Sequence, residues 1–204
     1  MTSLREPTTG VFGGSFDPIH LGHLLLARDV LEAIPLRRIL FVPAHQAPLR
    51  ANQPMASGQD RLDMILSATA NEPRFDVSEL EINATEVNYT IDTVEKLVGV
   101  FPEERFALIV GADQLMKLPQ WKRVEELVEL TDFICLERPG YELASLPRLE
   151  LNCLSIKSRS IQVSSSEIRE RLQKGLSVEY MLPNPVLEMI QARRLYGVQP
   201  IESH

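Results

Sequence analysis

Short apolar runs alternate along the chain with longer segments in which apolar residues recur every three or four positions. A short run of apolar or β-branched residues predicts a strand, whereas the longer spacing predicts an amphipathic helix. The predicted strands are 9–12, 38–42, 75–82, 106–110, 133–136 and 149–156. The predicted helices are 24–34, 57–69, 90–98, 124–130, 164–172 and 186–196.

Continuous apolar strands between amphipathic helices are typical of a parallel sheet that helices cover on both faces. We therefore expect an α/β protein with a doubly wound, mainly parallel sheet. The length suits a single domain spanning 1–204, in which residues 164–197 form a small C-terminal helical subregion. Ligands of such sheets bind beyond the carboxyl ends of the strands, where the strand order reverses. The turns after 9–12 and 106–110 are therefore the first candidates for a site.

Composition and charge exclude some classes of function. The formal net charge of −7 argues against a surface that holds nucleic-acid backbone, although a local cluster of donors can still bind a small anion. The chain has no run of 18 apolar residues, and its first residues do not resemble a signal peptide. Cys135 and Cys153 lie in apolar stretches without metal-type spacing, which favours reduced, buried thiols. We expect a cytoplasmic protein without nucleic-acid or membrane partners.

The segment GGSFDPIHLGH follows the first predicted strand directly. Gly13 and Gly14 permit a tight turn and the close approach of a bulky ligand. His20 and His23 are three residues apart, so they share one face where the helix starts. Two imidazoles beside bare backbone and a helix N-terminus suit a phosphate that gains negative charge. The alternative is a structural turn whose histidines face solvent.

A second candidate segment, QVSSSEIRERL, opens the helix predicted at 164–172. Its serine hydroxyls lie where backbone N–H groups point outward, and Arg169 shares a face with Ser166. An anion-binding site fits this pattern. An ordinary capping box between Ser164 and Glu167 fits it as well. The two interpretations are compatible, because the cap uses only one hydroxyl.

These two segments resemble the signatures of the nucleotidyltransferase superfamily named for its H-x-G-H motif, matched here from His20 to His23. The second signature, I-S-S-T-x-I-R, is matched with valine for the first isoleucine and Ser166 for threonine. The resemblance implies a Rossmann-like fold and adenylyl transfer. It also implies that both histidines stabilise the α-phosphate of ATP, and that Ser166 and Arg169 hold the β- and γ-phosphates.

Two further segments, NYTIDTVEKL and VGADQLMKLPQW, narrow the resemblance to the bacterial nicotinate-nucleotide adenylyltransferase family. By that resemblance Tyr89 and Thr90 border a nicotinate pocket, and Gly111 and Asp113 contact the nucleotide. Trp121 would stack on the pyridine ring; from its surroundings alone it could equally be a core residue. Phosphopantetheine adenylyltransferases share H-x-G-H but lack these two segments.

The implied reaction is adenylyl transfer from ATP to nicotinate mononucleotide, giving nicotinate adenine dinucleotide and pyrophosphate. The acceptor's own phosphate is the nucleophile, so positioning and charge stabilisation supply the catalysis. Mg²⁺ should be held by the substrate phosphates and water, because the sequence has no cluster of carboxylates with metal-ligand spacing. The alternatives are another acceptor (nicotinamide mononucleotide or phosphopantetheine) and a non-catalytic nucleotide-binding protein of this fold. The sequence leaves open whether the chain forms a homo-oligomer.

One segment departs from the family pattern. Where the family has P-P-H-K, this chain reads APLR, with Leu49 in place of the histidine and Arg50 in place of the lysine. His45, four residues earlier, is a weak candidate to replace the lost histidine. The candidate catalytic residues are His20 and His23, and the candidate mononucleotide-binding residues are Tyr89, Thr90 and Trp121. The candidate ATP-binding residues are Gly13, Gly14, Ser15, Phe16, Arg50, Gly111, Asp113, Ser165, Ser166, Ile168 and Arg169.

Overall fold

The architecture was analysed in a computed structural model that describes residues 4, 8–45, 55–84, 88–137 and 151–198. Six strands form one sheet in the order β3-β2-β1-β4-β5-β6, and every neighbouring pair is parallel. The expected doubly wound α/β fold is confirmed, and the described sheet is parallel throughout. The strands are β1 (Thr8–Gly14), β2 (Arg38–Pro43), β3 (Phe75–Val77), β4 (Arg105–Gly111), β5 (Asp132–Glu137) and β6 (Cys153–Lys157).

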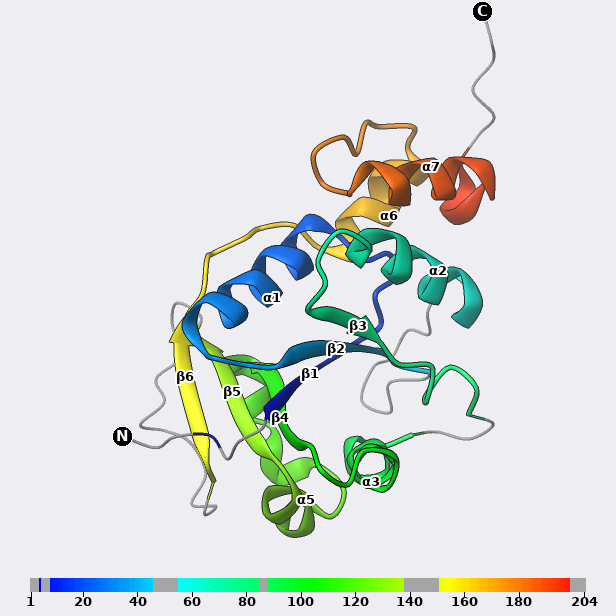
Figure 1. The fold of residues 1–204 in the computed structure, drawn as a ribbon. Helices are drawn as coiled ribbons and strands as arrows, with labels where there is room; N and C mark the ends of the chain where they lie inside the picture. Colours follow the sequence, from blue (N-terminus) through cyan, green and yellow to red (C-terminus); the bar gives the residue numbers. More distant parts are fainter. Residues whose placement is uncertain (1–3, 5–7, 46–54, 85–87, 138–150, 199–204) are drawn as a thin grey trace, which may run out of the picture.

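Helices cover both faces of the sheet (Figure 1). One face carries α1 (Leu21–Ala33) and α2 (Gly58–Thr69), with α6 (Ser165–Gln173) and α7 (Asn184–Ala192) beyond them. The other face carries α3 (Thr90–Val100) and α5 (Val124–Leu130). Three short helices complete the described chain: α4 (Ala112–Leu115), η1 (Leu118–Gln120) and η3 (Leu195–Gly197). No described helix has the length and apolar character that a membrane crossing requires.

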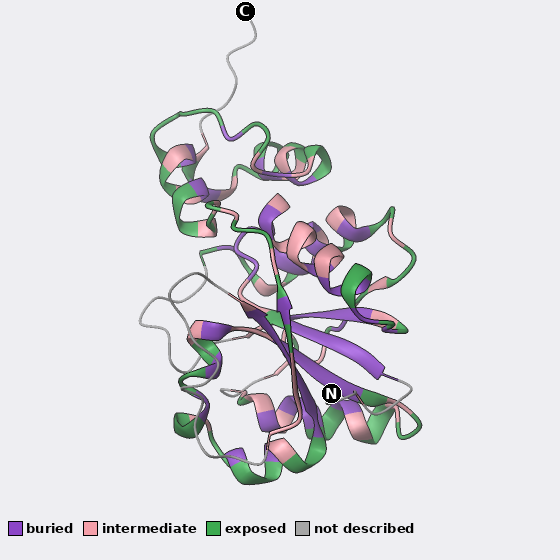
Figure 2. Cartoon of the chain, turned by 90° about the vertical axis from the view of Figure 1, so that its left-hand side faces the viewer, coloured by how far each residue is buried: buried purple, intermediate pink, exposed green. Residues whose placement is uncertain are grey.

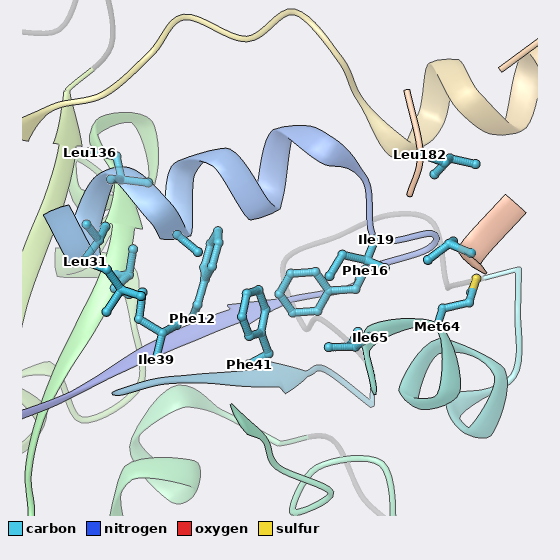
Figure 3. Close-up of a cluster of buried hydrophobic side chains, with 14 of the residues drawn as sticks. Phe12, Phe16, Ile19, Leu31, Ile39, Phe41, Met64, Ile65, Leu136 and Leu182 are labelled. Carbon is cyan, nitrogen blue, oxygen red and sulfur yellow. The ribbon is translucent and has the colours of Figure 1, made fainter. Parts of the chain in front are cut away.

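Two apolar cores lie between the sheet and its helices, and the central strands are buried along most of their length (Figure 2). In the first core Phe12, Phe16 and Phe41 make edge-on or tilted ring contacts, with centroids 5.6–5.8 Å apart (Figure 3). The second core packs Ile91, Val94 and other residues of α3 against β4 and β5. The first core thus includes Phe16, which lies in the loop after β1.

The structure corrects three sequence-based boundaries. The strand predicted at 75–82 ends at Val77, because Ser78 makes the last bond to β2 and the following residues form turns. Within the strand predicted at 149–156, residues 149–150 lie outside the described part, and β6 starts only at Cys153. The helix predicted at 186–196 ends at Ala192. Beyond it, Arg194 and Tyr196 adopt positive φ angles of 52° and 59°, which reverse the chain.

Candidate functional site

A cavity of about 980 Å³ lies at the carboxyl edge of the sheet, where β1 and β4 are neighbours but their connections run in opposite directions. This is the point at which doubly wound sheets bind their ligands. The loop after β1, the start of α3, the segment from Gly111 to Lys122 and the start of α6 all line it. Residues from both ends of the sequence therefore meet in one site.

The loop after β1 brings bare backbone to this cavity. A Cβ atom on Gly13 would have no described neighbour within 4 Å, so this glycine leaves room on the cavity side. Gly22 is needed because space is short there: a Cβ atom added at this position would lie 2.9 Å from Nδ1 of His20. Any larger residue in the middle of H-x-G-H would displace the histidine ring, which explains why glycine stands between the two histidines.

The two histidines lie against one another at the start of α1. Their rings are stacked with centroids 3.7 Å apart, and the backbone N–H of His20 donates to Nδ1 of His23 at 3.2 Å. His20 is only 6% exposed, and burial lowers its pKa from 6.5 to about 4. Burial therefore keeps His20 neutral near pH 7.

The start of α6 forms the predicted helix cap and places other serines differently. Ser164 caps the helix by accepting from the backbone N–H of Glu167 at 3.2 Å. Ser165 donates to the carbonyl of Pro18 at 2.9 Å, which ties α6 to the loop before α1. Ser166 is left at the cavity, where it accepts from Nη2 of Arg169 at 3.3 Å.

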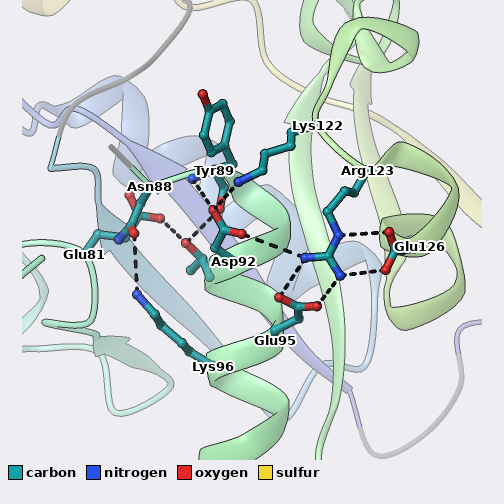
Figure 4. Close-up of polar contacts among 10 residues, drawn as sticks. Glu81, Asn88, Tyr89, Asp92, Glu95, Lys96, Lys122, Arg123 and Glu126 are labelled. Carbon is teal, nitrogen blue, oxygen red and sulfur yellow. Dashed lines mark hydrogen bonds and ion pairs between the residues drawn. The ribbon is translucent and has the colours of Figure 1, made fainter. Parts of the chain in front are cut away.

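The start of α3 forms the opposite wall of the cavity. The N-cap is Tyr89, whose backbone N–H donates to Asp92 at 3.2 Å, and α3 begins at Thr90. The ammonium group of Lys122 lies 4.2 Å from the centroid of the Tyr89 ring and 3.4 Å from the Asp92 carboxylate (Figure 4). The first N–H groups of a helix have no partner within it. This wall therefore offers hydrogen-bond donors and a cation.

An ion pair network joins α3 and α5 next to Trp121 in the sequence. Arg123 pairs with Glu95 of α3 at 2.7 Å and with Glu126 of α5 at 2.6 Å, so it links the two helices (Figure 4). Trp121 is two residues earlier and lines the cavity. Its indole Nε1 is buried without a hydrogen-bond partner among the described residues. The ring has the placement of a ligand platform, although part of it also packs on the second core.

Most of the candidate residues line the same cavity. They are Gly13, Gly14, Ser15, Phe16, His20, His23, Tyr89, Thr90, Gly111, Asp113, Trp121, Ser165, Ser166 and Arg169. Ile168 does not line it: its side chain is fully buried in the first core, and its N–H bonds to the carbonyl of Ser164. Leu49 and Arg50 lie outside the described residues. His45 is described but does not line the cavity.

Sequence reasoning missed three polar residues in or behind this site, of which two are buried and Glu81 is half-buried. Arg61 of α2 is 2% exposed and donates to the carbonyls of Ser15 and Ala44, both at 2.7 Å. Glu81 accepts from the Thr93 hydroxyl at 2.6 Å, and burial raises its pKa. The third is Asp17, which is 2% exposed. A signal existed for Arg61, because it lies on the apolar face of the predicted helix at 57–69, four residues before Ile65.

Comparisons with known proteins identify the family of this chain and relate its fold to solved structures. A model of the family described as cytidylyltransferase-like matches residues 11–171. Proteins named probable nicotinate-nucleotide adenylyltransferase are 41% identical in Thermus thermophilus, over 92% of this chain and 98% of that protein, and 39% identical in Shouchella clausii, over 92% and 96%. The solved Plasmodium falciparum nicotinic acid mononucleotide adenylyltransferase complexed with NaAD shares the fold, with a TM-score of 0.75 and 21% identity over 95% of this chain and 99% of that one.

The buried His20 predicts that stability depends on pH. Between pH 6.5 and 5 the unfolded chain binds a proton at this position, whereas the native protein, with a pKa of about 4, does not. Unfolding free energy should therefore fall on acidification, with this residue contributing on the order of 2 kcal/mol over that interval. Urea denaturation at several pH values gives the unfolding free energy at each pH. This free energy should depend less steeply on pH for His20→Gln than for the parent. His45→Gln is the control, and equal slopes for His20→Gln and the parent would refute the prediction.

Proposed function

Because the chain belongs to the nicotinate-nucleotide adenylyltransferase family, within the cytidylyltransferase-like group, we propose that it transfers the adenylyl group of ATP to nicotinate mononucleotide. The products are nicotinate adenine dinucleotide and pyrophosphate, a step of NAD biosynthesis. The observation that carries the proposal is the shared cavity: the histidine pair, the start of α6 and the start of α3 all line it. Family membership also supports a cytoplasmic location.

The reaction needs no nucleophile from the protein. A phosphate oxygen of the mononucleotide attacks the α-phosphorus of ATP, and the bond from that phosphorus to the β-phosphate oxygen breaks as pyrophosphate leaves. The protein contributes by holding the reacting groups in line and by stabilising charge on the α-phosphate. We assign this stabilisation to His20 and His23. The ring stacking and the hydrogen bond from the His20 backbone N–H to Nδ1 of His23 fix the imidazoles before ATP arrives, so little reorganisation accompanies the reaction.

Nucleotidyltransferases of this kind generally use a divalent metal ion, and we propose Mg²⁺. The described residues contain no group of three or more His, Cys, Asp or Glu side chains placed to hold a metal. We therefore propose that the ion enters with ATP and is held mostly by phosphate oxygens and water. When bound, the ion neutralises phosphate charge. Arg169 and Ser166 supply side-chain donors to the leaving pyrophosphate, and Arg50 is a candidate to neutralise another phosphate.

The start of α3 suits a nicotinate carboxylate better than an amide. Free N–H groups and the positive end of the helix dipole favour a negatively charged acceptor. Lys122 adds a cation nearby. Asn88 Oδ1 accepts one long hydrogen bond from Lys96 at 3.4 Å (Figure 4), and its buried Nδ2, which has no hydrogen-bond partner among the described residues, is a further donor. The backbone donors and Lys122 favour a carboxylate, whereas an amide NH₂ would have to compete for the carboxylates of Asp92 and Glu81, which already accept from Lys122 and Thr93.

His20→Ala tests the assignment of the histidines. Loss of one donor to a developing negative charge typically lowers kcat by about 10²–10³. We expect that loss with a much smaller change in ATP affinity, because the interaction strengthens as charge develops. The measurement is pyrophosphate release under saturating substrates. A His20→Ala enzyme whose kcat stays within threefold of the parent would exclude this role.

Arg169→Ala tests the placement of the triphosphate. We expect the KM for ATP to rise about tenfold or more, because charge-assisted hydrogen bonds to phosphate are lost. The KM for nicotinate mononucleotide should change little. Titration of each substrate at a saturating level of the other measures both values. A defect confined to the mononucleotide would mean that the two phosphate sites are exchanged.

The third test compares the acid and amide mononucleotides as acceptors. Hydrogen bonds to a charged group contribute roughly 1.5–3 kcal/mol, which corresponds to about 10- to 150-fold discrimination. We expect kcat/KM to be at least tenfold higher with nicotinate mononucleotide than with nicotinamide mononucleotide in the pyrophosphate assay. Phosphopantetheine in the same assay tests the remaining acceptor. Equal efficiencies for acid and amide would point to a dual-specificity enzyme, and inactivity with every acceptor to a non-catalytic nucleotide-binding protein.

A further inference from the structure

The carboxylate of Asp17 is a buried junction between four parts of the chain. Its Oδ1 accepts from the Tyr196 hydroxyl at 2.8 Å and from the backbone N–H of Ala56 at 3.1 Å. Its Oδ2 accepts from the backbone N–H of Met55 at 2.8 Å. The same oxygen lies 3.6 Å from Nη1 of Arg169. Asp17 thus joins the loop after β1 to the approach to α2, to α6 and to η3.

Arg169 is held from more than one side. Its Nη1 donates to the Asp17 carbonyl at 2.7 Å and its Nη2 to Ser166 Oγ at 3.3 Å, while the nearby Asp17 carboxylate supplies the opposite charge. Arg169 keeps 20% of its side chain exposed and lines the cavity. A guanidinium group has five N–H donors in a rigid fork, so these contacts leave donors for a ligand while fixing the plane of the group.

Tyr196 reaches this junction because the chain reverses after α7. The positive φ angles of Arg194 and Tyr196 return the chain towards the first core, where the Tyr196 side chain is buried and the residue is only 5% exposed. Burial and the neighbouring Asp17 raise the pKa of the phenol, so the hydroxyl stays protonated and donates to the carboxylate. This bond links residues 179 positions apart in the sequence.

We propose that Asp17 and Tyr196 are positioning residues for Arg169, and through it for the triphosphate of ATP; the inference rests on the function proposed above. Tyr196 satisfies Oδ1 of Asp17 and holds the carboxylate in its present orientation. Without the hydroxyl, Oδ1 retains one described donor, and the under-satisfied carboxylate would draw the guanidinium of Arg169 towards itself and away from a phosphate. Neither Asp17 nor Tyr196 need touch the reacting phosphorus for this effect.

Tyr196→Phe is the informative variant, because phenylalanine keeps the buried ring and removes only the hydroxyl. The kcat/KM for ATP should fall about fivefold or more, as loss of one such hydrogen bond implies, while the KM for nicotinate mononucleotide stays within twofold. The matched control is Arg193→Gln. It removes the ion pairs of Arg193 with Asp60 and Asp63, at 2.8 and 2.6 Å, and so loosens the same C-terminal subregion without touching Asp17. The control should leave both substrates unaffected.

A double-mutant cycle separates positioning from general destabilisation. If Tyr196 acts through Arg169, Tyr196→Phe should cause no further loss for ATP once Arg169 is alanine. Additive losses, or an equal loss for both substrates, would overturn the inference. An Arg169→Ala enzyme with an unchanged KM for ATP would instead count against the proposed phosphate site itself. Circular dichroism and the ATP-induced rise in Tm check that Tyr196→Phe folds; this rise should be smaller than in the parent.

Discussion

A guanidinium group buried behind the ligand edge of the sheet is the constraint on which the site depends. Arg61 donates to the carbonyl oxygens of Ser15 and Ala44, which follow β1 and β2. A buried charge is tolerated only with good partners, and loss of one partner of a buried pair costs about 3–5 kcal/mol. The attraction of Asp17 for Arg61 supplies opposite charge nearby. The loops after β1 and β2 therefore depend on a buried cation, and an apolar side chain in its place would leave these two carbonyl groups without the donor that Arg61 supplies.

The N-terminal ends of helices meet at the cavity although the protein as a whole is acidic. In a parallel sheet, helices that follow strands begin at the carboxyl edge, so their N-termini converge there. His20 precedes α1, Tyr89 precedes α3 and Ser164 precedes α6, and all three line the cavity. Local dipoles and a few cations thus act where the ligand binds, while a net charge of −7 is spread over the whole chain.

Local patterns predicted the parts of this structure that local physics determines. Apolar runs located β2 and β4, and the Ser57 and Ser164 caps were visible as helix starts. The strand predicted at 75–82 was wrong after Val77, because alternating residues also occur in turns. Tyr196 was assigned to a helix, since periodicity cannot reveal two positive φ angles. Asp17 and Arg61 escaped notice as a pair because their proximity arises from tertiary packing.

The bond between Tyr196 and Asp17 also has a consequence for how the protein is made. Ribosomes synthesise a chain from its N-terminus at about 5–20 residues per second, so the 179 positions between these residues represent roughly 10–35 s of translation. During that interval β1 and the histidine pair can form, but Arg169 and Tyr196 do not yet exist. The buried Asp17 carboxylate therefore waits for its partners on α6 and η3 until long after the strand before it has been made.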